Sequence, residues 1–185
     1  MAEYGTTDVL LDFEKVVELE VELEKLGQPT KLLGMELTWS KNNESVKLTQ
    51  QDSIEKMDKE YSITTIPRRS IPQEGYNAEQ EPEANLTKYQ SLIGSLLYIN
   101  RMTRLDISLL VNLLGRQTAK PGTTNYQMAK QFGQFLASTK TEGLLITKKE
   151  TLEDLIIIYA DASYGGENSR SQSGSLVTLY GTLIM

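Results

Sequence analysis

The sequence predicts an α+β protein in which a β-hairpin and a block of helices precede further strands. Three observations predict this class. Apolar residues alternate with polar ones over residues 32–49, recur at helical spacing over 86–138, and form nearly continuous runs after residue 154. The change in periodicity near residue 150 predicts a boundary there. We therefore expect three units, which are residues 1–66, 67–150 and 151–185.

The first elements are a helix and a hairpin. Residues 12–26 predict a helix, because glutamate and leucine favour helix and Gly27 with Pro29 ends it. Its acidic face is interpreted as solvated surface and not as a site. Residues 32–49 predict a β-hairpin, whose turn lies at Lys41-Asn42-Asn43.

A helical block follows the hairpin. Residues 50–61 predict a short helix, and residues 66–82, with three prolines, predict an exposed connection. Three longer helices are then expected over residues 86–100, 105–117 and 124–138. Each carries a broad apolar face, so we expect these helices to bury their apolar faces against one another.

The last part of the chain predicts strands. Residues 143–149 predict a short strand with a basic end. The apolar run over residues 155–161 is typical of a strand that is buried on both faces. Residues 174–184 predict two strands around Gly181, which we expect to adjoin the strand at 155–161 in one sheet.

Composition limits the chemistry that the chain can perform. The 185 residues are 39% hydrophobic, include no run of about 18 apolar residues and do not begin like a signal peptide, so we expect an intracellular protein with no membrane partner. The chain has no cysteine or histidine, which excludes disulfides, thiolate zinc sites and histidine general bases. The net charge of −6 argues against a free-standing nucleic-acid-binding protein.

Asp161 is the main candidate for chemistry, because it follows an apolar run and is expected at the end of a buried strand. A carboxylate at a strand end either begins a turn or holds a cation. The residues alone leave both interpretations open.

Two segments of the chain contain distinctive motifs, YADASYGGENSRSQSG at residues 159–174 and SLIGSLLYINRMTRLDI at residues 91–107. Both resemble segments of the Pol polyproteins of copia-type (Pseudoviridae) retrotransposons. The first resembles the start of the RNase H region, with Arg170 in the place of a family lysine. The second resembles a Ser-Leu-Val-Gly-Ser-Leu-Leu-Tyr-Leu … Thr-Arg-Pro-Asp-Ile block, with Leu105 in place of the proline. We interpret the 91–107 block as a packing element that performs no chemistry.

Two further segments extend the resemblance to about residues 31–184. Residues 32–57 resemble the Leu-Gly-x-x-Ile hairpin that grips the primer end in reverse transcriptases, and residues 119–139 resemble a helix that is normally more basic. The resemblance implies the C-terminal reverse transcriptase region running into the start of RNase H. The three units would then be palm-like, thumb-like or connection-like, and a truncated RNase H-like sheet.

The resemblance implies Mg²⁺ as cofactor, yet neither set of carboxylates is complete. Two-metal catalysis needs several carboxylates around the ions. At the nuclease site, Asp161 would be the first catalytic carboxylate and metal ligand, provided that missing residues completed the site. At the polymerase site, Asp8 would be a remnant of a double-aspartate turn just before the first helix, and a solvated N-terminal segment is the alternative. We therefore expect no bound Mg²⁺.

The resemblance also implies contacts with a primer–template or an RNA/DNA hybrid. The implied contact residues are Lys120, Lys130, Arg104 and Arg170. Gln131, Gln134 and Ala137 stand where the family tends to carry arginine or lysine. Because backbone contacts need these charges, we expect weak binding.

Three functional hypotheses follow. The first is a degenerate, inactive fragment of a reverse transcriptase/RNase H polyprotein, with the rest of the polyprotein as partner and, by resemblance, the cytoplasmic virus-like particle and the nucleus as locations. The second is an excised part of an active RNA-directed DNA polymerase/RNase H. The third is a domesticated protein-interaction module, which the acidic first helix favours over a nucleic-acid-binding protein.

Overall fold

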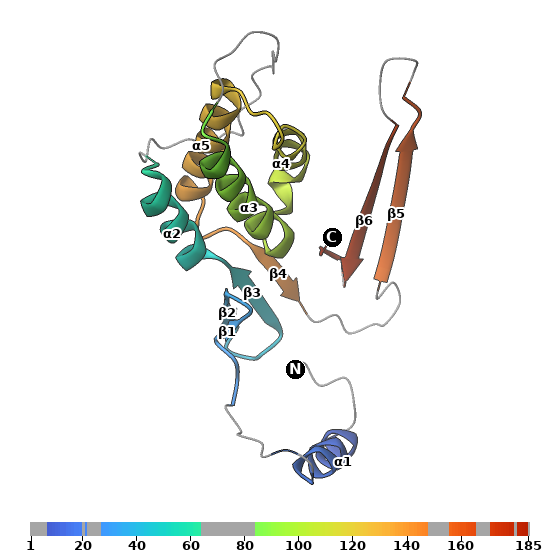
Figure 1. Ribbon diagram of the computed structural model, residues 1–185. Helices are drawn as coiled ribbons and strands as arrows, with labels where there is room; N and C mark the ends of the chain where they lie inside the picture. Colours follow the sequence, from blue (N-terminus) through green and yellow to red (C-terminus); the bar gives the residue numbers. More distant parts are fainter. Residues whose placement is uncertain are drawn as a thin grey trace.

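A computed structural model describes residues 7–19, 21, 27–63, 84–147, 156–165, 171–179 and 181–184. Within these ranges the protein consists of helices and two antiparallel sheets, so the predicted α+β class is confirmed. The helices α2 to α5 lie together, and the longest β-hairpin stands beside them (Figure 1). No helix in the described ranges has the length and apolar character needed to cross a membrane.

The first sheet contains the predicted hairpin. Its strands are β1 (Lys31–Leu32), β2 (Met35–Trp39), β3 (Ser45–Thr49) and β4 (Leu144–Thr147), all antiparallel in the order β1-β2-β3-β4. The register of β2 and β3 places Trp39 opposite Val46. The sequence predicted a strand near β4 but not its partner, which is β3, with Leu144 opposite Leu48. This pairing adds β4 to the first sheet, although the whole helical block lies between β3 and β4 in the sequence.

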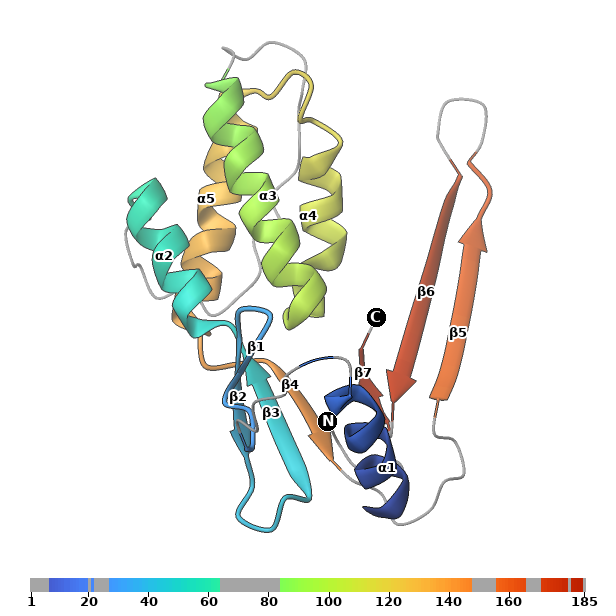
Figure 2. The same cartoon turned by 60° about the horizontal axis from the view of Figure 1, so that its bottom comes forward.

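The helical block agrees with the prediction to within a few residues. The helices are α2 (Gln51–Tyr61), α3 (Leu86–Met102), α4 (Ser108–Gly115) and α5 (Thr123–Ser138), with the 3₁₀ turn η1 (Leu105–Ile107) before α4. The four helices lie side by side (Figure 2), and their apolar faces meet in one core. The fully buried side chains of this core include Ile54, Tyr89, Leu92, Leu96, Ile107, Val111, Phe132 and Leu136. The predicted connection at 66–82 lies outside the described residues.

The first helix differs from the prediction. Helix α1 (Thr7–Glu18) begins earlier than residue 12 and ends earlier than residue 26. One further helical hydrogen bond joins the amide of Val21 to the carbonyl of Val17 at 2.9 Å. From Val17 to Leu23 the apolar residues of the sequence alternate with glutamates, which weakens the 3.6-residue spacing, and residues 22–26 of the predicted helix lie outside the described ranges. Helix α1 stands apart from helices α2 to α5, as Figures 1 and 2 both show.

The strands of the second sheet form as predicted, but the first of them is not buried on both faces. Its strands are β5 (Ile156–Ser163), β6 (Gln172–Leu179) and β7 (Thr182–Leu183), with Gly181 at φ 76° in the expected turn. The prediction that β5 is buried on both faces is wrong, because Ile158 is 68% exposed and Tyr159 is 57% exposed. Among the described elements β5 pairs with β6 alone and no helix covers it.

In the described ranges the two sheets meet where β7 lies beside β4. The Thr182 hydroxyl in β7 donates a hydrogen bond of 2.7 Å to the carbonyl of Leu145 in β4. The predicted boundary near residue 150 lies in residues 148–155, outside the described ranges.

Candidate functional site

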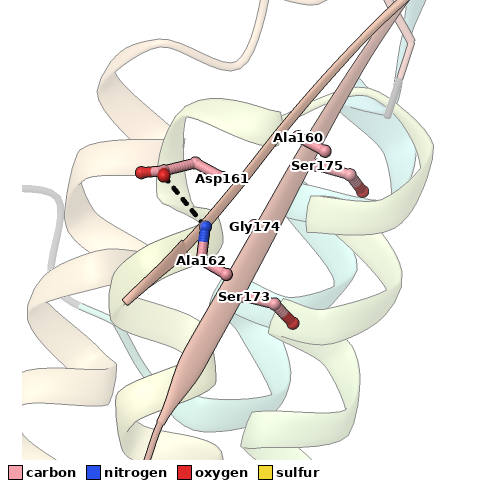
Figure 3. Close-up of a pocket in the computed structure, with 6 residues that line it drawn as sticks. All are labelled: Ala160, Asp161, Ala162, Ser173, Gly174 and Ser175. Atoms are coloured by element: carbon pink, nitrogen blue, oxygen red, sulfur yellow. Dashed lines mark hydrogen bonds between the residues drawn. The ribbon is translucent and has the colours of Figure 1, made fainter. Parts of the chain in front are cut away.

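Asp161 lies inside strand β5 and not at its end, because the strand continues to Ser163. In the antiparallel register Asp161 is opposite Gly174 of β6. The two strands form an open hollow there, which is lined by Ala160, Asp161, Ala162, Ser173, Gly174 and Ser175. The Asp161 carboxylate and the hydroxyls of Ser173 and Ser175 project from opposite faces of the hairpin (Figure 3). The serines are therefore not placed to join Asp161 around one ion.

The carboxylate of Asp161 is exposed and bonds locally. It accepts a hydrogen bond of 2.9 Å from the amide of Ala162, the next residue. The side chains that share its face of the hairpin include Tyr159 and Leu176, which offer no carboxylate. Within the described ranges no three acidic residues gather where they could hold a metal ion. The described residues thus do not by themselves fit the Mg²⁺ site that the resemblance implies.

The other predicted catalytic residue, Asp8, lies in the first turn of helix α1. The expectation of a turn before the first helix is therefore wrong at this position, since the apolar residues Val9 and Leu10 extend the helical pattern towards the N-terminus. The side chain of Asp8 is outside the described part of the structure, as is the whole of Arg170.

Arg104 is a buried structural residue in this fold, with only 2% of its surface exposed. Its Nε and Nη2 atoms donate to the two carboxylate oxygens of Asp106 at 3.0 and 2.7 Å. Its Nη1 atom donates to the carbonyl and the hydroxyl of Thr139, at 3.1 and 2.8 Å, and the guanidinium carbon lies 5.2 Å from the centre of the Phe135 ring. These bonds tie η1 to the end of α5, so the arrangement disfavours a phosphate contact at Arg104.

Other residues of the 91–107 block also make contacts within the fold, in agreement with the interpretation of this block as a packing element. The Thr103 hydroxyl donates to the buried Gln50 side chain at 2.7 Å. The hydroxyl of Tyr61 donates to that of Ser91 at 2.7 Å and joins α2 to α3. Tyr98 reaches the β1–β2 turn, where its hydroxyl donates to the carbonyl of Leu33 at 2.7 Å. The sequence pattern contained no signal for this last contact, because it joins residues 65 positions apart.

The face of α5 that we expect to contact nucleic acid lies on the outward side of the helix. Lys130, Gln131, Gln134 and Ala137 are all partly exposed. The Lys130 ammonium lies 5.7 Å from the centre of the Tyr126 ring, a cation–π distance. Lys120 is exposed in the segment before α5. The fold therefore gives Lys120 and Lys130 access to solvent, with neutral side chains next to Lys130.

A charged cluster links α2 to the end of α5. The Lys140 ammonium bonds the Glu55 carboxylate at 2.7 Å. The hydrogen bonds from Lys140 and Gln51 hold the pKa of Glu55 below its ordinary value. Burial raises the pKa of nearby Asp58 to about 6, against an opposing effect of the Lys140 charge. One oxygen of Asp58 is buried without a hydrogen-bond partner, which accounts for the cost of its charged form.

Known proteins share sequence with most of this chain. The chain is 29% identical over 162 residues to the putative transposon Ty5-1 protein of Saccharomyces cerevisiae, a match that covers 85% of the chain and 52% of that protein. It is 25% identical over 175 residues to the Retrovirus-related Pol polyprotein from transposon TNT 1-94 of Nicotiana tabacum, covering 88% of the chain and 13% of the polyprotein. The chain is distantly homologous to copia-type retrotransposon Pol polyproteins.

A third relative has a different kind of name. The Secreted RxLR effector protein 161 of Plasmopara viticola is 35% identical over 95 residues, which are 50% of this chain and 66% of that protein. The chain thus spans about half of the Ty5-1 protein and a small part of the TNT 1-94 polyprotein. No protein-family model matches the chain, and no solved structure matches it.

Proposed function

We propose that this chain corresponds to the end of the reverse transcriptase region and the start of the RNase H region of a retrotransposon Pol polyprotein. The homology to two transposon proteins over more than four fifths of the chain supports the proposal. The order of the elements also agrees with it, since a hairpin, a helical block and a strand pair follow one another. The helical block would act as a thumb-like scaffold and the rest of the polyprotein would be its partner.

The second half of the proposal is that the chain alone has neither polymerase nor nuclease activity, and the isolation of Asp161 carries its nuclease part. Phosphoryl transfer by two Mg²⁺ ions needs several converging carboxylates. In the described residues Asp161 projects from an exposed hairpin, and no second acidic side chain shares its hollow. Asp161 would contribute to a site only together with carboxylates supplied from elsewhere.

Activity assays test this proposal directly. We expect the purified chain to give no primer extension and no cleavage of an RNA/DNA hybrid in Mg²⁺ or Mn²⁺. Asp161→Asn is the matched control, because it removes the carboxylate and keeps the size of the side chain. Turnover that disappears in Asp161→Asn would contradict the proposal and favour an excised active polymerase/RNase H.

Weak contact with a primer–template is the binding activity that we propose. Lys120 and Lys130 supply charge, whereas Gln131, Gln134 and Ala137 interrupt it. We expect affinity no tighter than the roughly 10⁻⁴ to 10⁻⁶ M of nonspecific complexes at physiological salt.

Fluorescence anisotropy at two salt concentrations measures this affinity. The triple variant Gln131→Arg, Gln134→Arg, Ala137→Lys should bind more tightly and with a steeper salt dependence, because each new charge can neutralise a phosphate. Nanomolar binding by the unchanged chain, or no response in the triple variant, would show that the contact face lies elsewhere.

A protein-interaction module is the second candidate function. Two observations favour it: apolar residues of α1 are exposed, with Phe13 at 59% and Val16 at 62%, and a relative is named as a secreted effector protein. On this proposal α1 would bind another protein through its apolar residues. The double variant Phe13→Ser, Val16→Ser should then abolish binding to the rest of the polyprotein in a pull-down and leave nucleic-acid binding unchanged. Unchanged pull-down would remove this candidate.

A further inference from the structure

Strand β5 forms an open edge of the second sheet. The strand order is β5-β6-β7, so in the described part of the chain only one side of β5 has a neighbouring strand. Both views place β5 at the outside, with the helical block beyond β6 (Figures 1 and 2). The edge is eight residues long, Ile156–Ser163, and contains no lysine or proline. Proteins commonly protect exposed edges with such residues, because an unprotected edge can pair with another strand.

Hydrogen bonding across the sheet shows which backbone groups face this edge. The carbonyl of Val177 in β6 accepts the amide of Ile184 at 2.8 Å, so the backbone groups of Val177 face β7. Because these groups alternate in direction along a strand, those of its two neighbours in β6 face β5. The residues opposite these neighbours are Tyr159 and Ile157. The intervening residues of β5 therefore send their backbone groups to the open edge. They are Ile156, Ile158, Ala160 and Ala162.

One of these four edge amides is already bonded. The Asp161 carboxylate accepts the amide of Ala162 at 2.9 Å, as Figure 3 shows. This bond agrees with the outward direction of the Ala162 amide and makes it a poor donor to another strand. The other three edge residues are spaced evenly about Ile158, whose side chain is 68% exposed. The available edge is therefore symmetric about Ile158.

We propose that two copies of this chain associate by antiparallel pairing of their β5 strands about a two-fold axis at Ile158. Ile158 then lies opposite Ile158 of the second copy, and Ile156 lies opposite its Ala160. An identical strand fits this edge, because a two-fold axis at Ile158 maps the available groups of one copy onto those of the other. Both Ala162 amides keep their bonds to Asp161 in this register.

Side chains and charge also suit a second copy. Opposite residues of an antiparallel pair share one face of the sheet, so the pairing brings the exposed Ile156 and Ile158 of both copies together. No charged residue lies between Ile156 and Ala160. The Asp161 carboxylates lie beyond the paired stretch, about 20 Å apart along the strands, where salt screens their repulsion. Because the contact is small, we expect a weak dimer that forms at high protein concentration.

Cross-linking tests the register, and the absence of cysteine from the chain makes the test specific. In Ile158→Cys the two thiols face each other across the axis, with a Cα separation of about 5.5 Å that suits a disulfide. Ala160→Cys is the matched control, because it lies on the same face of β5 but about 14 Å from its own copy. We expect linked dimers of Ile158→Cys to form at least about tenfold faster under mild oxidation. Equal rates in the two variants would overturn the proposed register.

Sedimentation equilibrium tests the association itself. The mean mass should rise from one chain towards two as the protein concentration increases. Ile158→Lys should weaken the dimer about fivefold or more, because two like charges would lie opposite each other at the axis. Ala162→Lys should leave it unchanged, since this exposed residue of the same strand lies outside the paired stretch. A monomer at every concentration, or equal effects of the two substitutions, would overturn the proposal.

Amide hydrogen exchange followed by NMR distinguishes a second copy from cover by the chain itself. The edge amides of Ile156, Ile158 and Ala160 should exchange about twofold more slowly when half of the chains are paired. The amides of Ile157 and Tyr159 face β6, so their exchange should not depend on protein concentration. Protection of the Ile158 amide that is the same at all concentrations would show that another part of the chain covers the edge, and would overturn the proposal.

Discussion

The helical block and the β5–β7 sheet contain similar apolar residues, but those of the helical block are buried and several of those in the sheet are exposed. Ile93 in α3 is 1% exposed and packs among α2 to α5, whereas Ile158 in β5 is 68% exposed. Both lie in strongly apolar segments of the sequence. The difference is that the helices cover one another, while no described helix covers β5. An apolar sequence favours burial, and whether the segment is buried depends on the elements that pack against it.

The largest expected effect comes from truncating these two isoleucines. Ile93→Ala should lower the free energy of unfolding by about 2–5 kcal/mol, because it removes buried methyl groups and leaves a cavity. Ile158→Ala should change it by no more than about 0.5 kcal/mol, as at other exposed sites. Urea denaturation of both variants measures the contrast. A large loss in Ile158→Ala would show that β5 is covered in solution and would end the comparison.

Two aspartates sharpen the comparison for polar groups. Asp106→Asn should lower the free energy of unfolding by about 1–3 kcal/mol, because the buried Arg104 loses its charged partner. Asp161→Asn should have almost no effect on stability, since its carboxylate bonds only the adjacent amide of Ala162 among the interactions described. Thermal unfolding measures both. Similar losses in the two variants would mean that Asp161 has a partner in the folded protein.

Asp58 tests whether the helical block also contains a polar group that lowers its stability. Its pKa is raised from the ordinary 3.8 to about 6, so the folded state binds a proton more tightly than the unfolded state. Its contribution is therefore fully present below about pH 4 and is lost as the pH rises through about 6. Asp58→Asn should stabilise the protein at pH 7 by about 1 kcal/mol, after allowance for solvent screening.

Urea denaturation at pH 4 and pH 7 measures this dependence. The gain in Asp58→Asn should shrink at pH 4, where Asp58 is largely protonated in the natural chain. Glu55, whose pKa is lowered by Lys140, gives the opposite sign, because its contribution is lost as the pH falls. A gain that is the same at both pH values would exclude Asp58 as its source.

A further effect of about the same size is expected where the first sheet joins the helices. The Glu36 carboxylate of β2 accepts the amides of Gln51 and Asp52 at 2.9 and 3.2 Å, at the start of α2. The N-cap residue Gln50 makes no such bond with its side chain. Glu36→Gln should cost about 1 kcal/mol, as for other caps, whereas Glu60→Gln at the exposed end of α2 should cost nothing measurable. Equal effects would mean that Glu36 does not cap α2.

Local pattern was enough to predict most elements. The hairpin at 32–49, the helices of the block and the strand pair around Gly181 all appear close to the expected residues. Each rests on spacing or turn chemistry within about ten residues, which is the range over which side-chain periodicity acts. The predicted first helix begins at residue 12 and α1 begins at Thr7, because Val9 and Leu10 continue the apolar spacing of the helix.

The candidate site was predicted less well than the fold, for a physical reason. The sequence indicates Asp161 by its place after an apolar run, and the resemblance implies Arg104 as a contact residue. Whether a charged side chain faces solvent or another side chain depends on residues far away in the chain, such as Thr139 for Arg104. Neither the charge of Arg104 nor the order of the motifs distinguishes an arginine that contacts phosphate from an arginine that is buried and hydrogen-bonded within the protein.

The sequence by itself determined the element types, the absence of cysteine and histidine chemistry, and the resemblance to retrotransposon polyproteins. Only the tertiary structure decided that β4 pairs with β3, that Arg104 is buried against Asp106, and that the Tyr98 hydroxyl donates a hydrogen bond to the carbonyl of Leu33. Element type follows from neighbours along the chain, whose spacing is fixed by covalent geometry. Partners are fixed by the packing of the whole core, which joins residues that no local pattern connects.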